Sequence, residues 1–170
     1  NFKGKRKITF SVVRYGNVAG SRGSFMPYII KATKEKKIIN LTDKSMTRFN
    51  ISLDESIEMV IWAIKYTIGG EIVIPKIPSY KITKVAEAIG PECEHLVIGI
   101  RPGEKVHEEM ITPSDSFYTY DLGKYYTILP ARPKWSLEKS MNKILDWNRD
   151  IKFKTPREVC NNQIKDFLES

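Results

Sequence analysis

The chain reads Ile8-Thr9-Phe10-Ser11-Val12-Val13-Arg14-Tyr15-Gly16-Asn17 near its start, and this stretch indicates how the rest is built. Residues 8–15 are rich in β-branched and aromatic side chains, which predicts a largely buried β-strand. Gly16 and Asn17 favour turns, so we expect the strand to end there. The strand would therefore deliver polar side chains to a loop at its carboxyl end.

Helical and strand-like segments alternate over the residues that follow. Ser52 and Glu55 form a capping-box pattern, and apolar residues then recur at helical spacing before Gly69 and Gly70 end the helix. The face predicted to point inward comprises Leu53, Ile57, Val60, Ile61 and Ile64. Further helices are predicted at residues 25–36 and 79–89, strands at residues 37–42, 46–51, 71–75 and 95–100, and a hairpin at residues 117–129. This alternation predicts an α/β fold.

Size and composition exclude several classes of protein. The chain has 170 residues and is 41% apolar, which suits one core. No apolar run is long enough to span a membrane, and no secretory signal is present. Cys93 and Cys160 lie far apart without metal-ligand spacing, which predicts a cytoplasmic protein without structural zinc. The chain starts at Asn1 rather than methionine, and we therefore expect a piece of a longer protein or a processed product.

Positive charge is concentrated at the start of the chain. Residues 1–37 carry ten Lys or Arg and one acid, within a net charge of +8 for the chain. A basic end of this kind is compatible with nucleic-acid binding or with a solvated surface. No aromatic side chain interleaves the cluster at residues 3–7, so we predict no nucleic-acid partner and keep that function as a minor alternative.

Four blocks of sequence, taken together and in order, resemble one known family. They span residues 11–24, 42–49, 70–79 and 99–108, the last reading Gly99-Ile100-Arg101-Pro102-Gly103-Glu104-Lys105-Val106-His107-Glu108. They are similar to the UDP-N-acetylglucosamine 4,6-dehydratases, including the 5-inverting type, of the extended short-chain dehydrogenase/reductase superfamily and the polysaccharide biosynthesis proteins. The resemblance runs from about residue 8 to residue 130.

The resemblance implies that this chain is the C-terminal part of an extended Rossmann-type enzyme. It would contain late Rossmann strands and a small α/β substrate-binding domain in residues 1–130. The resemblance does not extend into residues 131–170, a C-terminal extension in which Thr155 and Pro156 predict the start of a helix at the end of the chain. The half that binds NADP and supplies the catalytic residues would be absent. The implied reaction is oxidation at C4 of the hexose, loss of water across C5 and C6, and return of hydride to C6. The chain alone is expected to be inactive.

The resemblance also implies roles for individual residues. Arg48 and Arg101 resemble clamps for the diphosphate, and Glu104 resembles the acceptor for the ribose hydroxyls. These roles suit the residue types, because arginine pairs with phosphate in two-point geometry and a carboxylate accepts two hydroxyls.

Further roles follow from the first block. Asn17 resembles the asparagine that hydrogen-bonds the sugar diphosphate, and Ser24 and Phe25 resemble the loop that meets the nucleotide. Tyr15 and Gly16 would lie near the nicotinamide of NADP. No residue of this chain is expected to be catalytic or to bind a metal.

One apparent motif is excluded on physical grounds. Tyr120-Asp121-Leu122-Gly123-Lys124 has the Tyr-x-x-x-Lys spacing of short-chain dehydrogenases. That dyad requires both side chains on one helix, whereas Gly123 and the strand-like flanks predict a hairpin. No glycine-rich dinucleotide fingerprint follows any predicted strand.

Two alternatives to the enzyme portion remain open. One is a stand-alone nucleotide-sugar-binding or partner-docking module without catalysis, and the other is the nucleic-acid binder. If residues 8–15 and 71–75 belong to a Rossmann sheet, the isolated chain exposes strand edges and apolar faces. We therefore predict that it forms a homo-oligomer or associates with the missing half. Arg14, at the predicted strand end, is expected to be an ion-pair partner rather than a ligand contact.

Overall fold

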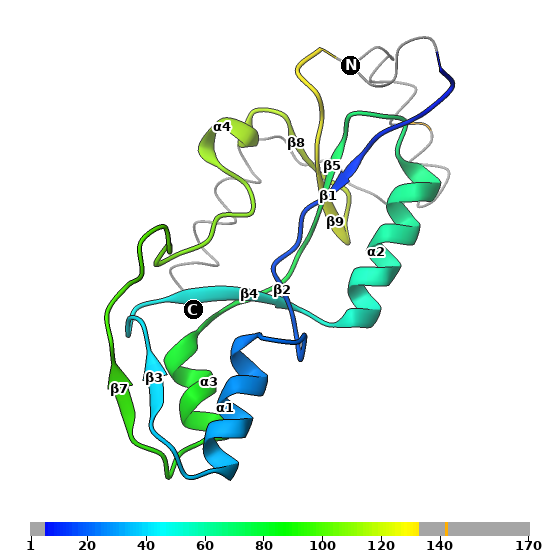
Figure 1. Cartoon of the computed structure of the whole chain (residues 1–170). Helices are drawn as coiled ribbons and strands as arrows, with labels where there is room; N and C mark the ends of the chain where they lie inside the picture. The colour runs from blue at the N-terminus through cyan, green and yellow to red at the C-terminus, as the bar shows by residue number, and fades with distance from the viewer. Residues whose placement is uncertain (1–5, 133–141, 143–170) are drawn as a thin grey trace. The chain divides into compact units, whose positions relative to one another are not determined.

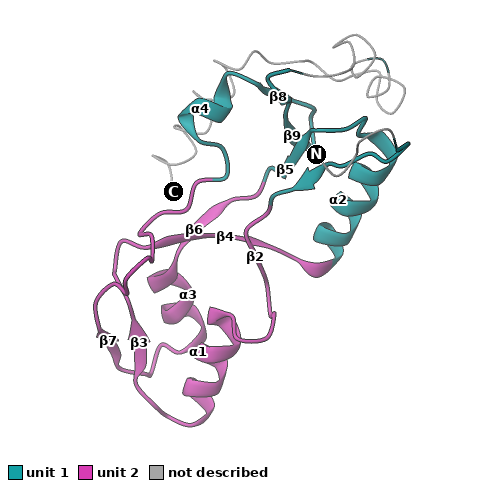
Figure 2. Cartoon of the chain, turned by 45° about the horizontal axis from the view of Figure 1, so that its top comes forward, with its two compact units in different colours: residues 1–14, 54–76, 110–169 teal, residues 15–53, 77–109, 170 magenta. Residues whose placement is uncertain are grey.

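The computed structural model of the protein describes residues 6–132 and residue 142. The described chain forms two compact units that interleave along the sequence (Figure 2). Among the described residues, unit 1 comprises 6–14, 54–76, 110–132 and 142, and unit 2 comprises 15–53 and 77–109. Most of the predicted C-terminal extension, including the helix expected after Thr155 and Pro156, lies outside the described residues.

Unit 1 is built on a four-stranded sheet with the order β1-β5-β9-β8 (Figure 1). Its elements are β1 (Val12–Val13), α2 (Leu53–Tyr66, whose first residue is counted with unit 2), β5 (Ile72–Pro75), α4 (Pro113–Ser116), β8 (Thr119–Asp121) and β9 (Tyr125–Ile128). β1 runs parallel to β5, whereas β9 is antiparallel to both β5 and β8. The core contains buried residues of α2, β5 and the β8–β9 hairpin: Met59, Trp62, Ala63, Val73, Leu122 and Tyr125.

The hairpin predicted at residues 117–129 is confirmed. β8 and β9 pair in antiparallel register, with Tyr120 opposite Thr127. Gly123 in the turn has φ 82°, a conformation that other residues rarely adopt.

The prediction of a buried strand over residues 8–15 is wrong in extent and in burial. Only Val12 and Val13 pair with β5, and Val12 remains 53% exposed. Ile8 and Phe10 are exposed as well. The apolar pattern is real, but among the described residues β1 pairs only with β5, and burial depends on what covers each face of the strand: Val13 packs against the unit 1 core, whereas Val12 is left exposed.

The helix predicted after Ser52 is confirmed, but the predicted inner face is wrong. α2 buries Ser56, Met59, Trp62 and Ala63. The predicted inward residues Leu53, Ile57, Val60, Ile61 and Ile64 are all exposed, with Ile64 at 76%. α2 is apolar on two faces, and the described chain covers the face that carries Met59 and Trp62.

Unit 2 contains two small sheets and two helices. Its elements are β2 (Asn17–Val18), α1 (Phe25–Lys34), β3 (Ile39–Leu41), β4 (Thr47–Ile51), β6 (Ser79–Lys81), α3 (Ile82–Ile89) and β7 (His95–Val97). The sheet β2-β4-β6 pairs β2 parallel and β6 antiparallel to β4, and β3 runs parallel to β7. α1, α3 and β3 close a core together with Met46: Ile29, Ala32, Ile39, Leu41, Met46, Ile82 and Ala86.

The strand predicted at residues 95–100 is shorter and more exposed than expected. β7 ends at Val97, and Leu96, Val97, Ile98 and Ile100 are each more than 40% exposed. The chain then continues into the loop that begins at Arg101. Residues 106–110 contain bends and form no helical turn.

None of the helices in the described residues is both long and apolar enough to span a bilayer.

Candidate functional site

The loop after β7 forms a tight turn between Arg101 and Glu104. The Glu104 N–H donates to the Arg101 carbonyl at 3.0 Å, and the Arg101 N–H donates to Glu104 Oε2 at 3.3 Å. Gly103 provides the positive φ of 82° that the turn requires. The turn leaves the Arg101 side chain exposed and folds the Glu104 carboxylate back over the backbone.

Arg48 in β4 contacts the same loop through its whole guanidinium group. Its Nη1 donates to the carbonyls of Thr47 at 2.7 Å and Val106 at 3.1 Å. Its Nη2 lies 3.5 Å from Glu104 Oε1, and its Nε lies 3.4 Å from Glu108 Oε1. The Arg48 side chain is 12% exposed, so these four acceptors surround a largely buried cation.

Two further hydrogen bonds hold residues 106 and 107 against β4. The Thr47 N–H donates to the Val106 carbonyl at 3.1 Å. The Thr47 Oγ1 lies 2.8 Å from His107 Nδ1. Tyr80 in β6 lies opposite Arg48 in the sheet, and burial raises the pKa of its phenol. We refer to Arg48, Arg101, Glu104 and Glu108 with these supporting contacts as the Arg48 cluster.

The predicted residues Arg48 and Glu104 are therefore brought together, and the Arg101 backbone joins them. Glu108 was not among the predicted site residues. A charge at residue 108 is visible in the sequence, but its partner lies 60 residues away, and only the tertiary fold shows that the two meet.

Ser24 and Phe25 lie at the start of α1. Ser24 is the N-cap residue, yet its hydroxyl makes no capping hydrogen bond and is buried without a partner among the described residues. A buried hydroxyl without a partner is rare in proteins. Phe25 packs against the unit 2 core, so part of its surface is structural.

Asn17, Gly16 and Tyr15 lie on and before β2. Asn17 is exposed and lies opposite Asn50 of β4. A Cβ at Gly16 would lie 2.4 Å from the Phe49 carbonyl oxygen, so close packing against β4 requires glycine there. Tyr15 is 39% exposed. Within the described chain, no hydrogen bond or ion pair joins these residues to the Arg48 cluster.

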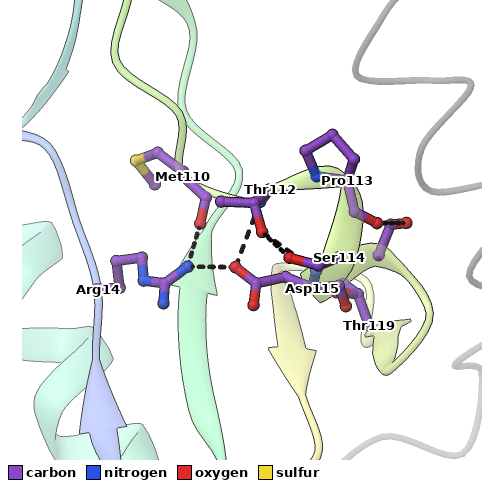
Figure 3. Close-up of polar contacts among 8 residues, drawn as sticks. Arg14, Met110, Thr112, Pro113, Ser114, Asp115 and Thr119 are labelled. Atoms are coloured by element: carbon purple, nitrogen blue, oxygen red, sulfur yellow. Dashed lines mark hydrogen bonds and ion pairs between the residues drawn. The ribbon is translucent and has the colours of Figure 1, made fainter. Parts of the chain in front are cut away.

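Arg14 belongs to a separate polar cluster in unit 1 (Figure 3). Its Nη1 donates to the Met110 carbonyl at 2.8 Å and pairs with Asp115 Oδ2 at 2.9 Å. Asp115 and Thr112 form the capping box of α4. Burial alone would raise the pKa of Asp115, but the hydrogen bonds from Arg14 and Thr112 outweigh it and leave this pKa below its ordinary value. The prediction of Arg14 as an ion-pair partner is confirmed.

The Tyr120/Lys124 pair does not form a catalytic dyad. Tyr120 lies in β8, and Lys124 follows the turn at Gly123 rather than lying one helical turn away. Lys124 Nζ pairs with Glu58 at 2.5 Å, and this hydrogen bond raises the pKa of the lysine. Among the residues described, no three His, Cys, Asp or Glu side chains are grouped so that they could hold a metal ion.

Comparison with known proteins places these features in a family. The sequence profile described as "Polysaccharide biosynthesis protein" matches residues 1–130. A UDP-N-acetylglucosamine 4,6-dehydratase (inverting) from Campylobacter jejuni is 48% identical over 132 residues, which cover 77% of this chain and 40% of that protein. The chain thus spans well under half the length of this relative.

Two solved structures share the fold. The structure of Pen from Bacillus thuringiensis has a TM-score of 0.71 and 35% identity, covering 79% of this chain and 43% of that one. UDP-glucose 4-epimerase from Thermus thermophilus, solved as a complex with NAD, has a TM-score of 0.53 and 15% identity, covering 88% of this chain and 49% of the other, and shows the fold alone. The α/β fold is thereby confirmed, as a match to about half of these structures. The chain belongs to the polysaccharide biosynthesis protein family and is homologous to part of the inverting UDP-N-acetylglucosamine 4,6-dehydratases.

Proposed function

We propose that this chain is the UDP-sugar-binding portion of an NADP-dependent UDP-N-acetylglucosamine 4,6-dehydratase, a cytoplasmic lyase of surface-polysaccharide or glycoconjugate biosynthesis. The observation that carries the proposal is the turn from Arg101 to Glu104, held by Arg48. It sets an exposed guanidinium beside an ordered carboxylate. This pair matches a nucleoside diphosphate, which offers anionic oxygens and two ribose hydroxyls.

Each residue of the turn has a role in this proposal. Arg101 binds the diphosphate, and Arg48 contributes positive charge behind it. Glu104 accepts hydrogen bonds from the ribose hydroxyls, because a carboxylate has about four lone-pair sites and only some are used here.

The start of α1 supports a second contact with the nucleotide. The Ser24 hydroxyl lacks a partner, and a helix N-terminus favours negative charge. Asn17, exposed on β2, would contact the sugar diphosphate.

The redox cofactor would be held mainly by another part of the enzyme. Tyr15 and Gly16 would lie beside the nicotinamide of NADP. Tyr15 is exposed, and Gly16 packs closely against Phe49. Bound NADP would supply hydride transfer at C4 and C6 of the hexose. In the residues described, no helix carries a Tyr-x-x-x-Lys pair, so this chain binds and orients substrate and leaves proton transfer to the other part.

The surface of unit 1 supports association with such a part. β1 is an edge strand in a parallel pair, and parallel sheets are normally covered on both faces. The apolar face of α2 formed by Ile57, Val60, Ile61 and Ile64 is exposed in the same unit. We therefore propose that the cofactor-binding part covers this α2 face and the free edge of β1. Self-association would cover the same surface when that part is absent.

Calorimetric titration with UDP-N-acetylglucosamine and with UDP tests the proposal. Wild type is expected to bind both, and Arg101→Ala and Glu104→Ala are each expected to weaken binding at least tenfold by removing a charged hydrogen-bonding group. Lys105→Ala is the matched control, because it removes an exposed charge next to Glu104 for which we assign no ligand role. Failure of wild type to bind either ligand would overturn the proposal.

A second function, a nucleotide-sugar-binding or docking module without catalysis, shares the same clamp. It is favoured by the fact that the Arg48 cluster forms entirely within unit 2. Addition of NADP and the N-terminal portion of a homologous dehydratase separates the two functions. Conversion of UDP-N-acetylglucosamine to a keto sugar supports the enzyme, and tight binding without turnover supports the module. The chain with NADP alone is expected to produce no keto sugar.

A further inference from the structure

We propose that Glu108 is a positioning residue, which engages the Nε of Arg48, limits Glu104 to one donor of that arginine and so keeps the Glu104 carboxylate available for the ribose. This inference rests on the proposed nucleotide-binding function and adds to it a residue and a specificity. Glu108 would act without touching the nucleotide.

The donors of Arg48 are divided among acceptors that the protein itself supplies. Both carbonyl contacts, to Thr47 and Val106, use Nη1. The Nε edge faces Glu108 at 3.4 Å. The guanidinium is planar and rigid, and the two hydrogen bonds on Nη1 orient it. Nη2 lies 3.5 Å from Glu104, so Glu104 and Glu108 share the remaining edge at similar distances, both longer than a strong charged hydrogen bond.

Glu104 therefore keeps accepting capacity. Its Oε2 accepts the Arg101 N–H at 3.3 Å, and its Oε1 has only the distant contact with Arg48. A two-point pair with Arg48 would occupy both oxygens and compete with ribose hydroxyls. Glu108 prevents this competition because it faces Nε, which lies on the same edge of the guanidinium as Nη2, while the two carbonyls occupy Nη1, so Glu104 is left with a single donor.

The chain fixes Glu108 where this effect requires it. The two preceding residues are held to β4, since Val106 accepts from the Thr47 N–H and the His107 ring contacts the Thr47 hydroxyl. Glu108 is partly buried beside Arg48, whereas the next residue, Glu109, is exposed. Glu109→Gln therefore makes the same chemical change as Glu108→Gln one residue away, and it serves as the matched control.

The test compares UDP with 2′,3′-dideoxy-UDP, which keeps the base and the phosphates but lacks both ribose hydroxyls. In wild type the dideoxy compound is expected to bind at least tenfold more weakly, as for the loss of hydrogen bonds to a charged group. In Glu108→Gln this ratio is expected to fall toward one, while the affinity for 2′,3′-dideoxy-UDP stays within about threefold of wild type. Glu108→Asp keeps the charge and is expected to restore part of the ratio. Glu109→Gln is expected to match wild type.

A structural role for Glu108 would weaken both ligands equally and leave the ratio unchanged. That result, or an equal fall of the ratio in Glu109→Gln, would overturn the inference while leaving the proposed function in place. The double variant Glu104→Gln/Glu108→Gln should show no further fall beyond Glu104→Gln, because both changes act on one contact. A wild-type chain that binds UDP without discriminating against the dideoxy compound overturns this inference, and one that binds no UDP overturns the proposed function with it.

Discussion

The helices of the two units differ in how much of their apolar surface the described chain covers. In unit 2, α1 and α3 bury their main apolar residues against β3, and Ile29 and Ile39 are fully buried. In unit 1, α2 buries Met59 and Trp62 but leaves Ile61 and Ile64 exposed on another face. The proposed nucleotide-binding residues lie in unit 2, whereas the exposed apolar face of α2 belongs to unit 1.

This difference suggests that unit 2 binds the ligand and that unit 1 associates with another domain or another chain. A site that discriminates between ligands needs side chains held in place by a closed core, which unit 2 has. A helix with a second apolar face is suited to packing against another domain or another copy of the chain. The predictions below test whether the difference holds in solution, in order of decreasing effect.

The largest effect is expected from truncating one isoleucine in each unit. Ile29→Ala removes a fully buried side chain and should lower the free energy of unfolding by about 2–5 kcal/mol. Ile64→Ala changes a residue that is 76% exposed and, at concentrations low enough for the chain to be monomeric, should alter it by less than about 0.5 kcal/mol. Urea unfolding followed by circular dichroism measures both. A similar loss in the two variants would mean that the α2 face is covered in solution.

The second prediction concerns self-association through the α2 face. Without a partner, we expect the chain to form dimers or larger species, and Ile61→Lys should raise the dissociation constant at least tenfold, or about 1.4 kcal/mol. Lysine at the exposed Ile30 of unit 2 is the control and should have little effect. Sedimentation velocity over a range of concentrations measures this constant. A monodisperse wild-type monomer at every concentration would contradict the prediction.

The smallest effect is expected at the polar cluster of unit 1. Asp115→Asn removes the partner of Arg14 and should cost about 1 kcal/mol at pH 7, since the pair is partly exposed. The pKa of Asp115 is lowered in the folded chain, so its contribution is present above the unfolded pKa near 4 and disappears as the pH falls through the folded value. The difference in the free energy of unfolding between Asp115→Asn and wild type should therefore become smaller below about pH 4.

Urea unfolding of both proteins at a series of pH values measures this difference in the free energy of unfolding. Glu92→Gln, which neutralises an exposed carboxylate in unit 2, serves as the control. A difference that stays constant down to pH 2 would show that the ionised Asp115–Arg14 pair does not contribute.

Local patterns predicted the elements better than their surroundings. The α2 helix and the β8–β9 hairpin follow from spacing and turn residues, and the same hairpin excludes a Tyr120/Lys124 dyad. The inner face of α2 could not be chosen, because a helix with apolar residues on two faces does not say which one its own chain will cover. The prediction of a buried strand over residues 8–15 was wrong for a related reason: their composition predicts burial, but burial requires a neighbouring element that covers them.

The candidate site was predictable in residue type but not in pairing. Arg101 and Glu104 lie three residues apart, and Gly103 between them indicates a turn. The engagement of Arg48 by Glu108 depends on how residues 106 and 107 contact β4, a contact between distant segments. The packing of Gly16 against Phe49 is also a contact between distant segments. It explains on steric grounds why residue 16 is a glycine, which the local sequence pattern does not show.

The pairing of β4 with β6 has a consequence for protein engineering. These strands are antiparallel, with Phe49 opposite Ser79, so the ladder continued by two residues on each strand would set Ile51 near Ile77. The chain leaves unit 2 just after β4 and re-enters it just before β6. In topological terms, α2 and β5 form an insert at the tip of a β-hairpin. Starting the chain at residue 15, replacing residues 54–76 with a short turn and ending after residue 109 should therefore yield unit 2 alone, with the residues proposed to bind the nucleotide.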